Sequence, residues 1–417
     1  MRKLLLAGAL VAMLAALSTA TAAPEITTAP SATPGVTSRS ITIGGTFPLS
    51  GPASFYAPIP KGMKAYFSYI NSRRDRNGKR GVYGRQIVWK FYDDGYNPAN
   101  TVQQTNKLIL QDKVFAIVGP LGTEHNQAIR PILNSRKIPQ LMVTTGASFW
   151  GTQIKQFPWT TGWQPDYISE GKVYAKWVVA NKPGAKIAIF YQNDDYGKDY
   201  LNGFKQGLGS RTNLIVSEQS YEVTDASYAS QIVRQRASGA DVWVLLTTPT
   251  PTVRAIGTAR ALGWRPEQII INSVAATDGV MKAAVANAGA AFVNGAVSTG
   301  YLKNPSNPKY RTDAAVRQYN RLMTRYGPSG ANRADTFYYY GFAKAYDFVK
   351  LLYLAGPNPT RASIMKATRK INWFNPYMIK GVQSKTSATD PFVLDQFKLL
   401  RFSDGSWSEI SNLFKGR

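Results

Sequence analysis

Two short segments that end in small and hydroxyl residues carry the clearest chemical signal in this chain. Residues 118–123 (VGPLGT) and 143–148 (VTTGAS) each begin as an apolar strand and finish on glycine, serine and threonine. Ligands of open α/β sheets bind beyond the carboxyl ends of such strands, where glycine lets a ligand approach the backbone closely. A helix that begins after residues 122–123 would also offer free N–H groups to a carboxylate. The two segments predict a site for a small anionic or polar molecule, although ordinary strand-to-helix turns have the same composition.

Groups that could perform catalysis are few and poorly placed. The only histidine, His125, lies in the first turn of a predicted helix, where neighbouring Glu124 cannot form a hydrolase triad with it. The pairs Asp93-Asp94 and Asp194-Asp195 are neighbours in sequence, and neighbouring side chains of a strand point to opposite faces, so neither pair is a dyad by itself. We expect these aspartates to be turn residues and helix caps. A hydrolase that uses Asp94 or Asp194 is the weakest alternative.

Motifs for nucleotides, cofactors and metals are missing from the sequence. No GxGxxG, GxxxxGK[ST], HExxH or GxSxG pattern occurs. A chain with no cysteine and one histidine also lacks the usual ligands of zinc and iron–sulfur sites. We therefore expect no metal, no cofactor and no enzymatic activity.

The chain is strongly basic, with 50 Lys and Arg residues against 24 Asp and Glu residues and a net charge of +26. Such a surplus would suit nucleic acid, but the basic residues are spread along the chain, with small clusters only at residues 73–76 and 79–80. No recognition helix, zinc finger or RNA-binding signature accompanies them. We expect solvated helix faces, with some attraction to anionic envelope surfaces, and no nucleic-acid partner.

The first residues predict an export signal over residues 1–22. Arg2 and Lys3 precede an apolar stretch from Leu4 to Leu17 that is too short to span a membrane comfortably, and residues 20–22 (ATA) fit a cleavage site. A buried N-terminal helix is the alternative. Residues 23–39, rich in Pro, Thr, Ser and Ala, predict a flexible leader. Because no cysteine is present to carry a lipid anchor, we expect a soluble protein that is periplasmic or secreted.

Alternating strand and helix patterns over residues 40–300 predict an α/β protein of two lobes, each a doubly wound parallel sheet. Predicted strands cover residues 41–47, 87–92, 114–118 and 141–144 in the first lobe, and 186–191, 213–217, 242–247 and 268–272 in the second. Predicted helices cover residues 60–74, 98–112, 124–136, 166–181, 198–208, 226–237, 250–262 and 278–287, with Thr123 as a cap of the third.

The rest of the chain predicts a return to the first lobe and then to the second. After an extended stretch at 296–303, helices are expected at 308–326, 334–354 and 360–370, followed by a hairpin that turns at Asp404-Gly405. The predicted lobes are residues 40–160 plus 303–375 (N-terminal) and 161–302 plus 376–417 (C-terminal). Repeated crossings between lobes would make a hinge.

The chain resembles the leucine/isoleucine/valine-binding family of periplasmic solute-binding proteins of ABC transporters, over essentially all of residues 40–410. Six motifs in order carry the resemblance: residues 47–52 (FPLSGP), 92–94 (YDD), 117–120 (IVGP), 139–148 (PQLMVTTGAS), 191–197 (YQNDDYG) and 259–263 (ARALG). The resemblance implies two α/β lobes joined by a three-stranded hinge that close over one solute. It also implies a membrane permease as partner, and we expect a monomer.

The resemblance also implies a set of ligand contacts. In the first lobe a hydroxyl and a small-residue segment would bind a carboxylate, beneath an aromatic residue at the mouth of the pocket; in the second lobe a tyrosine and a threonine would close over the ligand. Matched by motif, these residues are Tyr56, Thr123, Gly146, Ala147, Ser148, Tyr196 and Thr248.

One segment departs from the family pattern. Amino-acid binders of this family place an acidic residue after the strand at 268–272, where it meets the ammonium group of the ligand, but residues 272–276 here read NSVAA. A buried ammonium without a partner charge is costly, so an aromatic or aliphatic carboxylate or a neutral solute would fit as well. Asp166 or Asp278 could replace the missing acid, which keeps amino acids open. An exported sensor of the same fold is the alternative to an import receptor.

Overall fold

The computed structural model describes residues 33–416. The predicted signal peptide, residues 1–22, and the greater part of the predicted leader lie outside the described residues. The end of that leader packs against the first strand, because the Thr42 amide donates to the Gly35 carbonyl (2.7 Å) and Val36 pairs with Ile41. The packed chain therefore begins before residue 40, although the sequence predicts that the first lobe starts at that residue.

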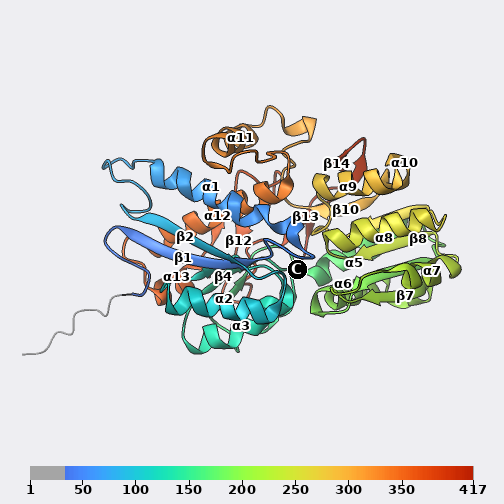
Figure 1. Ribbon diagram of the computed structural model, residues 1–417, viewed down its shortest axis with the longest axis horizontal. Coiled ribbons are helices and arrows are strands. Elements are labelled where there is room, and N and C mark those ends of the chain that lie inside the picture. The colour runs from blue at the N-terminus through green and yellow to red at the C-terminus, as the bar shows by residue number, and fades with distance from the viewer. Residues whose placement is uncertain (1–32, 417) are drawn as a thin grey trace, which may run out of the picture. The chain divides into compact units, whose positions relative to one another are not determined.

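The first lobe is built on a five-stranded parallel sheet in the order β2-β1-β3-β4-β5. Its strands are β1 (Ser40–Phe47), β2 (Gln86–Asp93), β3 (Ile117–Val118), β4 (Gln140–Val143) and β5 (Thr160–Gly162). The helices of this lobe come from both parts of the chain: α1 (Pro58–Ser72), α2 (Pro98–Leu110), α3 (Thr123–Ser135), α4 (Phe149–Thr152), α11 (Ala314–Tyr326), α12 (Thr336–Ala355) and α13 (Arg361–Ala367). Helices α1 and α12 lie side by side although they are far apart in sequence (Figure 1).

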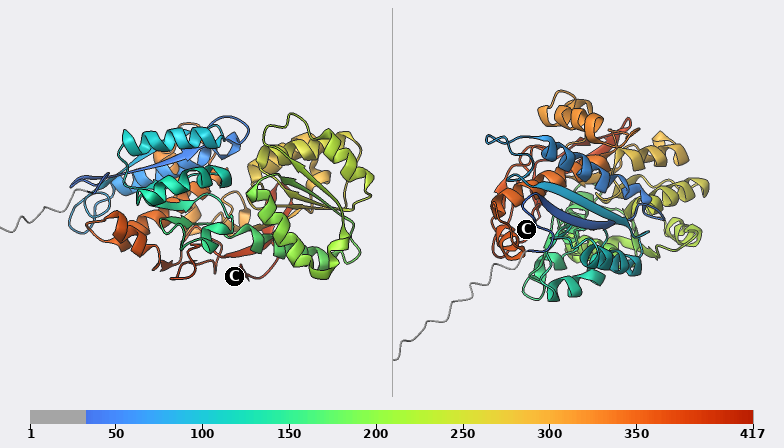
Figure 2. Two further views of the ribbon diagram at one scale, coloured as in Figure 1. Left: turned by 90° about the horizontal axis from the view of Figure 1, so that it is seen from below. Right: turned by 60° about the vertical axis from the view of Figure 1, so that its left-hand side comes forward.

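The second lobe is built on an eight-stranded sheet in which β7-β6-β8-β9-β10 repeats the order of the first sheet. These strands are β6 (Ile187–Gln192), β7 (Ile215–Tyr221), β8 (Val242–Leu246), β9 (Gln268–Ile271) and β10 (Val297–Gly300). Antiparallel β13 (Gln396–Ser403), β14 (Ser406–Glu409) and β15 (Phe414–Lys415) complete it. Its helices are α5 (Tyr167–Asn181), α6 (Asp195–Leu208), α7 (Ala229–Ala237), α8 (Pro249–Ala261), α9 (Asp278–Ala288) and α10 (Ala290–Val293). In Figure 2 the green and yellow elements, together with the red strands of the C-terminal hairpin, form this lobe.

The α/β fold, the two parallel sheets and the C-terminal hairpin are confirmed. Asp404 and Gly405 both have positive φ (50° and 79°), as a two-residue hairpin turn requires. One capping prediction is wrong: Gly122 occupies the N-cap of α3, and the Thr123 hydroxyl bonds Thr145 instead. The helix predicted at 308–326 begins at α11 only after Asp313, whose carboxylate caps it; residues 308–310 are a separate 3₁₀ turn.

Three segments connect the lobes: the one between β5 and α5, the one that follows β10, and the one that precedes β13. They are held to one another, since the Leu394 amide donates to the Trp163 carbonyl (2.8 Å) and the rings of Trp163 and Tyr301 lie 6.1 Å apart. The predicted return to the second lobe at residue 376 comes too early, because Tyr377 packs in the aromatic core of the first lobe against Tyr339 and Phe342.

A buried carboxylate, Asp347 of α12, ties this hinge to the first lobe. It accepts hydrogen bonds from Trp163 Nε1 (2.9 Å), Trp373 Nε1 (2.7 Å) and Ser384 Oγ (3.0 Å), which belong to three different segments of the chain. Residues 372–373 (β11) and 384–385 (β12) pair beside it as a two-stranded sheet. Burial raises the pKa of Asp347, against the effect of these hydrogen bonds.

Candidate functional site

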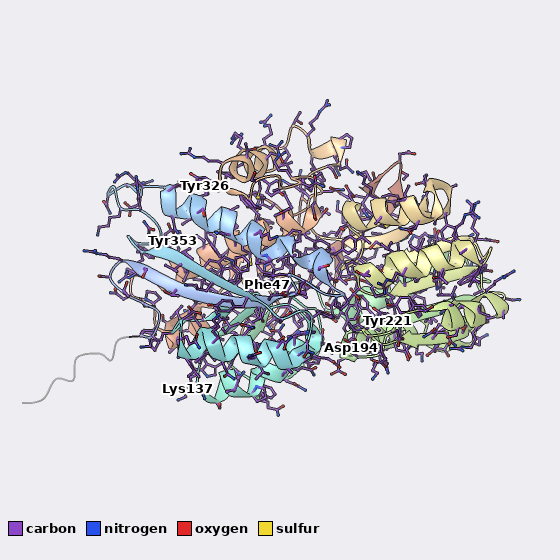
Figure 3. All side chains as sticks on the ribbon, in the orientation of Figure 1. Phe47, Lys137, Asp194, Tyr221, Tyr326 and Tyr353 are labelled. Carbon is purple, nitrogen blue, oxygen red and sulfur yellow. The ribbon has the colours of Figure 1, made fainter. Side chains whose placement is uncertain are left out.

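The topology places a crevice at the same point of each sheet. In an order of the type 2-1-3-4-5, the connections leaving the two central strands diverge, and ligands bind outside their carboxyl ends. In the first lobe these strands are β1 and β3, followed by Tyr56 and by Gly122-Thr123; in the second they are β6 and β8, followed by Tyr196 and Thr248. A cavity with about 910 Å³ of empty space, part of which is open solvent, lies between the lobes and is lined by residues of both. Figure 3 labels Phe47, at the end of β1, and Asp194, which follows β6.

The wall of this cavity is aromatic and hydroxylated but uncharged. None of its 26 lining residues is Asp, Glu, Lys, Arg or His. The aromatic and hydroxyl side chains that dominate it are Tyr56, Tyr96, Tyr167, Tyr196, Tyr301, Tyr340, Phe337, Trp407, Thr123, Thr144, Thr145, Thr248, Thr277, Thr299, Thr336 and Ser273. Such a wall suits a solute with an apolar or aromatic body and a few polar atoms.

Four of the seven residues singled out from the sequence line the cavity. The Tyr56 hydroxyl donates to the Val274 carbonyl of the other lobe (3.4 Å), and Thr123 shares a hydroxyl hydrogen bond with Thr145 (2.6 Å). Thr248 Oγ1 donates to Gln192 Oε1 (3.2 Å). The Tyr196 hydroxyl is buried and has no hydrogen-bond partner in the protein. It is therefore free to form a hydrogen bond with a solute.

The other three residues, Gly146, Ala147 and Ser148, do not line the cavity. The Gly146 carbonyl accepts from the Tyr167 amide (2.8 Å), and Ala147 is wholly buried in a small apolar cluster. Ser148 faces the second lobe, where its amide and hydroxyl donate to the Asp199 carboxylate (2.6 and 3.2 Å). Ser148 therefore bonds the first lobe to the second, and the role of this segment as a carboxylate site stays a prediction.

The sequence did not predict several residues of the cavity wall, because they belong to elements far along the chain. Thr336 and Phe337 begin α12, and Trp407 lies on β14 of the hairpin, yet all three face the same cavity as Tyr56. The ring of Phe337 packs edge-on against Tyr56 at 5.0 Å. The only sequence signal for them was the predicted return of the chain to each lobe, which does not say which side chains reach the crevice.

The carboxylates that could have met an ammonium group are turned to other partners. Asp166 caps α5, accepting from the Ser169 amide (3.0 Å) and hydroxyl (2.6 Å). Asp278 accepts both from Asn304 Nδ2 (3.0 Å) and from the Ser306 hydroxyl. Neither residue lines the cavity.

A third acid, which the sequence reasoning missed, lies directly behind the wall. Glu170 accepts from the Tyr174 hydroxyl (2.5 Å) and from the amide and hydroxyl of Ser273 (both 2.9 Å). Burial raises its pKa, against these hydrogen bonds. Ser273 lines the cavity and covers Glu170, so Glu170 supports the wall and is not part of the lining.

One buried cation stands behind the opposite wall. Lys344 of α12 donates from Nζ to Thr144 Oγ1 (2.6 Å) and to the Met142 carbonyl (3.0 Å), between the rings of Trp163 and Tyr340. Burial lowers its pKa well below the ordinary value. Because Thr144 lines the cavity, this cation lies one hydrogen bond away from it.

The candidate catalytic groups are structural, as expected. Asp194 caps α6 by accepting from the Gly197 amide (3.0 Å), and Asp94 accepts from the Tyr96 amide (3.0 Å) and from Thr101 (3.0 Å). Burial lowers the pKa of His125 to about 4, and its ring lies 4.2 Å from that of Tyr96. Within residues 33–416, acidic and histidine side chains form no group of three or more that could hold a metal.

The contact between Ser148 and Asp199 predicts a pH-dependent stability. Burial raises the pKa of Asp199 from 3.8 to about 6, against the Ser148 hydrogen bonds, and the nearby carboxylates of Asp166 and Asp195 raise it further. A raised pKa means that the folded state holds the proton more tightly than the unfolded state does. The stabilisation from this proton is complete below pH 3.8 and is lost as the pH rises through 6.

The variant Asp199→Asn keeps an uncharged side chain at every pH. We therefore expect its melting temperature, measured relative to the parent protein, to increase between pH 4 and pH 7, by calorimetry in matched buffers. A difference that stays constant over this range would contradict the assignment of a raised pKa to Asp199.

Comparison with known proteins identifies the family of this fold. Residues 40–393 match the family model described as periplasmic binding protein. The chain belongs to the periplasmic binding protein family. Its members are binding proteins and not enzymes, which agrees with the absence of catalytic motifs from the sequence. In the described part of the chain, no helix combines the length and apolar character needed to span a bilayer.

Individual relatives of this periplasmic binding protein are distant. It is similar to the Leu/Ile/Val-binding protein homolog 3 of Brucella melitensis biotype 1, with 26% identity over 206 residues, a match that spans 48% of this chain and 53% of the relative. Among solved structures, it resembles a fatty acid ABC transporter substrate-binding protein from Thermomonospora curvata, with a TM-score of 0.77 and 20% identity over 92% of this chain and 94% of the other. It also resembles a branched-chain amino acid ABC transporter protein from Thermus thermophilus with bound valine, with a TM-score of 0.76 and 17% identity over 90% and 97%. At these identities the structures show a shared fold.

Proposed function

We propose that this protein is the extracytoplasmic receptor of an ABC importer and that it captures one small solute in the cavity between its lobes. The observation that supports this most directly is the uncharged cavity of about 910 Å³ at the carboxyl ends of two like sheets. Its wall combines aromatic faces with a few polar groups, as in sites that bind small molecules. The bound solute is then released to a membrane permease, while this chain performs no chemistry.

Capture would proceed by movement of the lobes about the three connecting segments. Polar contacts between the lobes include Tyr56 to Val274, Ser148 to Asp199, and Gln127 Nε2 to Asp195 (2.9 Å). The segment after β10 adds Asn307 to the Trp407 carbonyl (2.7 Å) and Lys309 to Glu409 (2.8 Å). Opening of the cavity would break contacts of the first group, at about 1 kcal/mol for each hydrogen bond. A solute that contacts both walls would offset this cost and favour the closed form.

Relatives of this fold are named for solutes of different charge type, a fatty acid in one case and an amino acid in the other. We take from them the class of function, solute delivery to an ABC transporter, and place the protein in the periplasm or outside the cell, after removal of residues 1–22. A carboxylate-bearing solute agrees with the chemistry of the wall, because the hydroxyls can donate to a carboxylate and no lining residue is acidic.

The test is retention of solute by the purified mature chain. Mass spectrometry of material released by denaturation is expected to find one unaltered small molecule per chain. Scattering from the stripped protein is expected to show a larger radius of gyration than scattering after the solute is restored. A radius that does not change, with no solute retained and none that raises the melting temperature, would contradict the proposal. Conversion of a bound compound into a product would indicate an enzyme.

A further inference from the structure

We infer that the solute carries no ammonium group, that its body is aromatic or branched aliphatic, and that it presents a hydrogen-bond acceptor to Trp407. This inference rests on the proposed function and names the solute class of the same cavity. The acceptor is a carboxylate, carbonyl or ether oxygen. A monocarboxylic acid without an amine is the simplest member of this class.

The first support is the charge of the wall. An α-amino acid is a zwitterion, and its ammonium group loses its hydration when the lobes enclose it. A buried ammonium requires a carboxylate partner, yet no lining residue is acidic. Asp166, Glu170 and Asp278 all accept hydrogen bonds from other groups of the protein, and Glu170 and Asp278 are bonded to the lining residues Ser273 and Asn304. Asp94 and Asp194, which lie near the lining residue Tyr96, accept from backbone amides.

The second support is the cation behind the wall. Lys344 Nζ lies 2.6 Å from the Thr144 hydroxyl, which lines the cavity. The carboxylate of Asp347, three residues further along α12, accepts hydrogen bonds from Trp163, Trp373 and Ser384 in the hinge. In its protonated form Lys344 repels an ammonium and attracts a carboxylate, and in its neutral form it offers an ammonium no opposite charge. The groups around the cavity therefore favour binding of the deaminated acid over binding of the amino acid.

The third support is a donor that the protein leaves unused. Trp407 is 3% exposed and lines the cavity, and its Nε1 has no hydrogen-bond partner. An indole N–H only donates, and a buried donor without an acceptor is unfavourable. The Tyr196 hydroxyl, from the second lobe, and Thr336 Oγ1, from the first, are also buried without partners in this wall. A solute that offers acceptor oxygens would satisfy all three groups, since hydroxyls donate as readily as they accept.

The body of the solute follows from the remaining wall. Six tyrosines, Phe337 and Trp407 surround the space, and aromatic faces of this number favour a ring or a branched apolar chain. Ring and acceptor together describe an arylalkanoic acid or a comparable aliphatic acid.

The test uses two pairs of compounds that differ only in the amine: 3-phenylpropanoate against phenylalanine, and 4-methylpentanoate against leucine. Calorimetric titration of the stripped protein is expected to show at least tenfold tighter binding of the acid in each pair. Equal or tighter binding of either amino acid would overturn the inference and leave the proposed function standing. Should all four fail to bind, the retained solute decides: one without an amine supports the inference, and one with a protonated amine overturns it. Retention of no solute would overturn the inference; together with an unchanged radius of gyration and no solute that raises the melting temperature, it would overturn the proposed function as well.

The acceptor at Trp407 is tested by the variant Trp407→Phe, which keeps the ring and removes the N–H. We expect about tenfold weaker binding of the preferred acid and a melting temperature that is unchanged or higher, because an unsatisfied donor is removed. Trp264→Phe is the matched control, since Trp264 Nε1 donates to the Ala240 carbonyl (3.4 Å) and does not line the cavity. Equal affinities of the parent and Trp407→Phe proteins would overturn the assignment of an acceptor there.

Discussion

Replacement of Asp347 by alanine is expected to lower the free energy of unfolding by about 3–5 kcal/mol. The carboxylate is fully buried and accepts hydrogen bonds from Trp163, Trp373 and Ser384, none of which lies near another in sequence. Without it, two indole N–H groups and a hydroxyl lose their acceptor inside the protein, and an unsatisfied buried donor costs about 1–3 kcal/mol. Lys344, three residues earlier on α12, also loses the negative charge that favours its protonated form.

Denaturant unfolding of the mature chain measures this loss. Asp347→Asn retains one acceptor oxygen and should lose less stability than Asp347→Ala. Ser384→Ala is the control, because it removes one donor, leaves the carboxylate bonded to the two tryptophans, and should cost about 1 kcal/mol. The double variant should lose less stability than the sum of the losses in the two single variants, because both substitutions remove the same hydrogen bond. A loss below 1 kcal/mol for Asp347→Ala would show that the hinge does not depend on this group.

The sequence was sufficient for the parts of the fold that local patterns determine. Strand and helix alternation predicts both parallel sheets, and Asp404-Gly405 predicts the hairpin turn. Lobe boundaries were less predictable. The sequence assigns the segment that contains Tyr377 to the second lobe, yet its burial against Tyr339 depends on the packing of α12, which no local pattern describes.

The candidate site also combines residues that the sequence predicts with residues whose positions depend on long-range packing. Tyr56, Thr123, Tyr196 and Thr248 follow central strands of the sheets, so topology alone brings them to the crevice. Ser148 follows β4 in the same way, but its side chain meets Asp199 across the cleft, a contact that only the arrangement of the two lobes determines. Trp407 and Thr336 come from segments that return to the lobes late in the chain, and nothing in their local sequence indicates a site.

Replacement of Tyr196 by alanine is expected to weaken solute binding by about 1–3 kcal/mol while the fold survives, because a large aromatic contact at the centre of the crevice is lost. Tyr196 lines the cavity from the first turn of α6 and packs edge-on against Tyr167 at 5.2 Å. Its hydroxyl is one of the few polar groups of the wall that the protein does not use. The side chain therefore offers the bound solute both an apolar ring face and a hydroxyl that can form a hydrogen bond.

The variant Tyr196→Phe separates these two contributions, and the same helix supplies its control. Tyr200 lies one turn further along α6, is buried, and also carries a hydroxyl without a partner, but it does not line the cavity. Removal of either hydroxyl takes an unsatisfied polar group out of the interior, so neither variant should lower the melting temperature. Calorimetric titration with the retained solute should then show weaker binding only for Tyr196→Phe, since the Tyr200 hydroxyl has no access to the solute. Equal effects of the two variants on affinity would mean that α6 acts through the packing of the second lobe, and that the solute does not touch Tyr196.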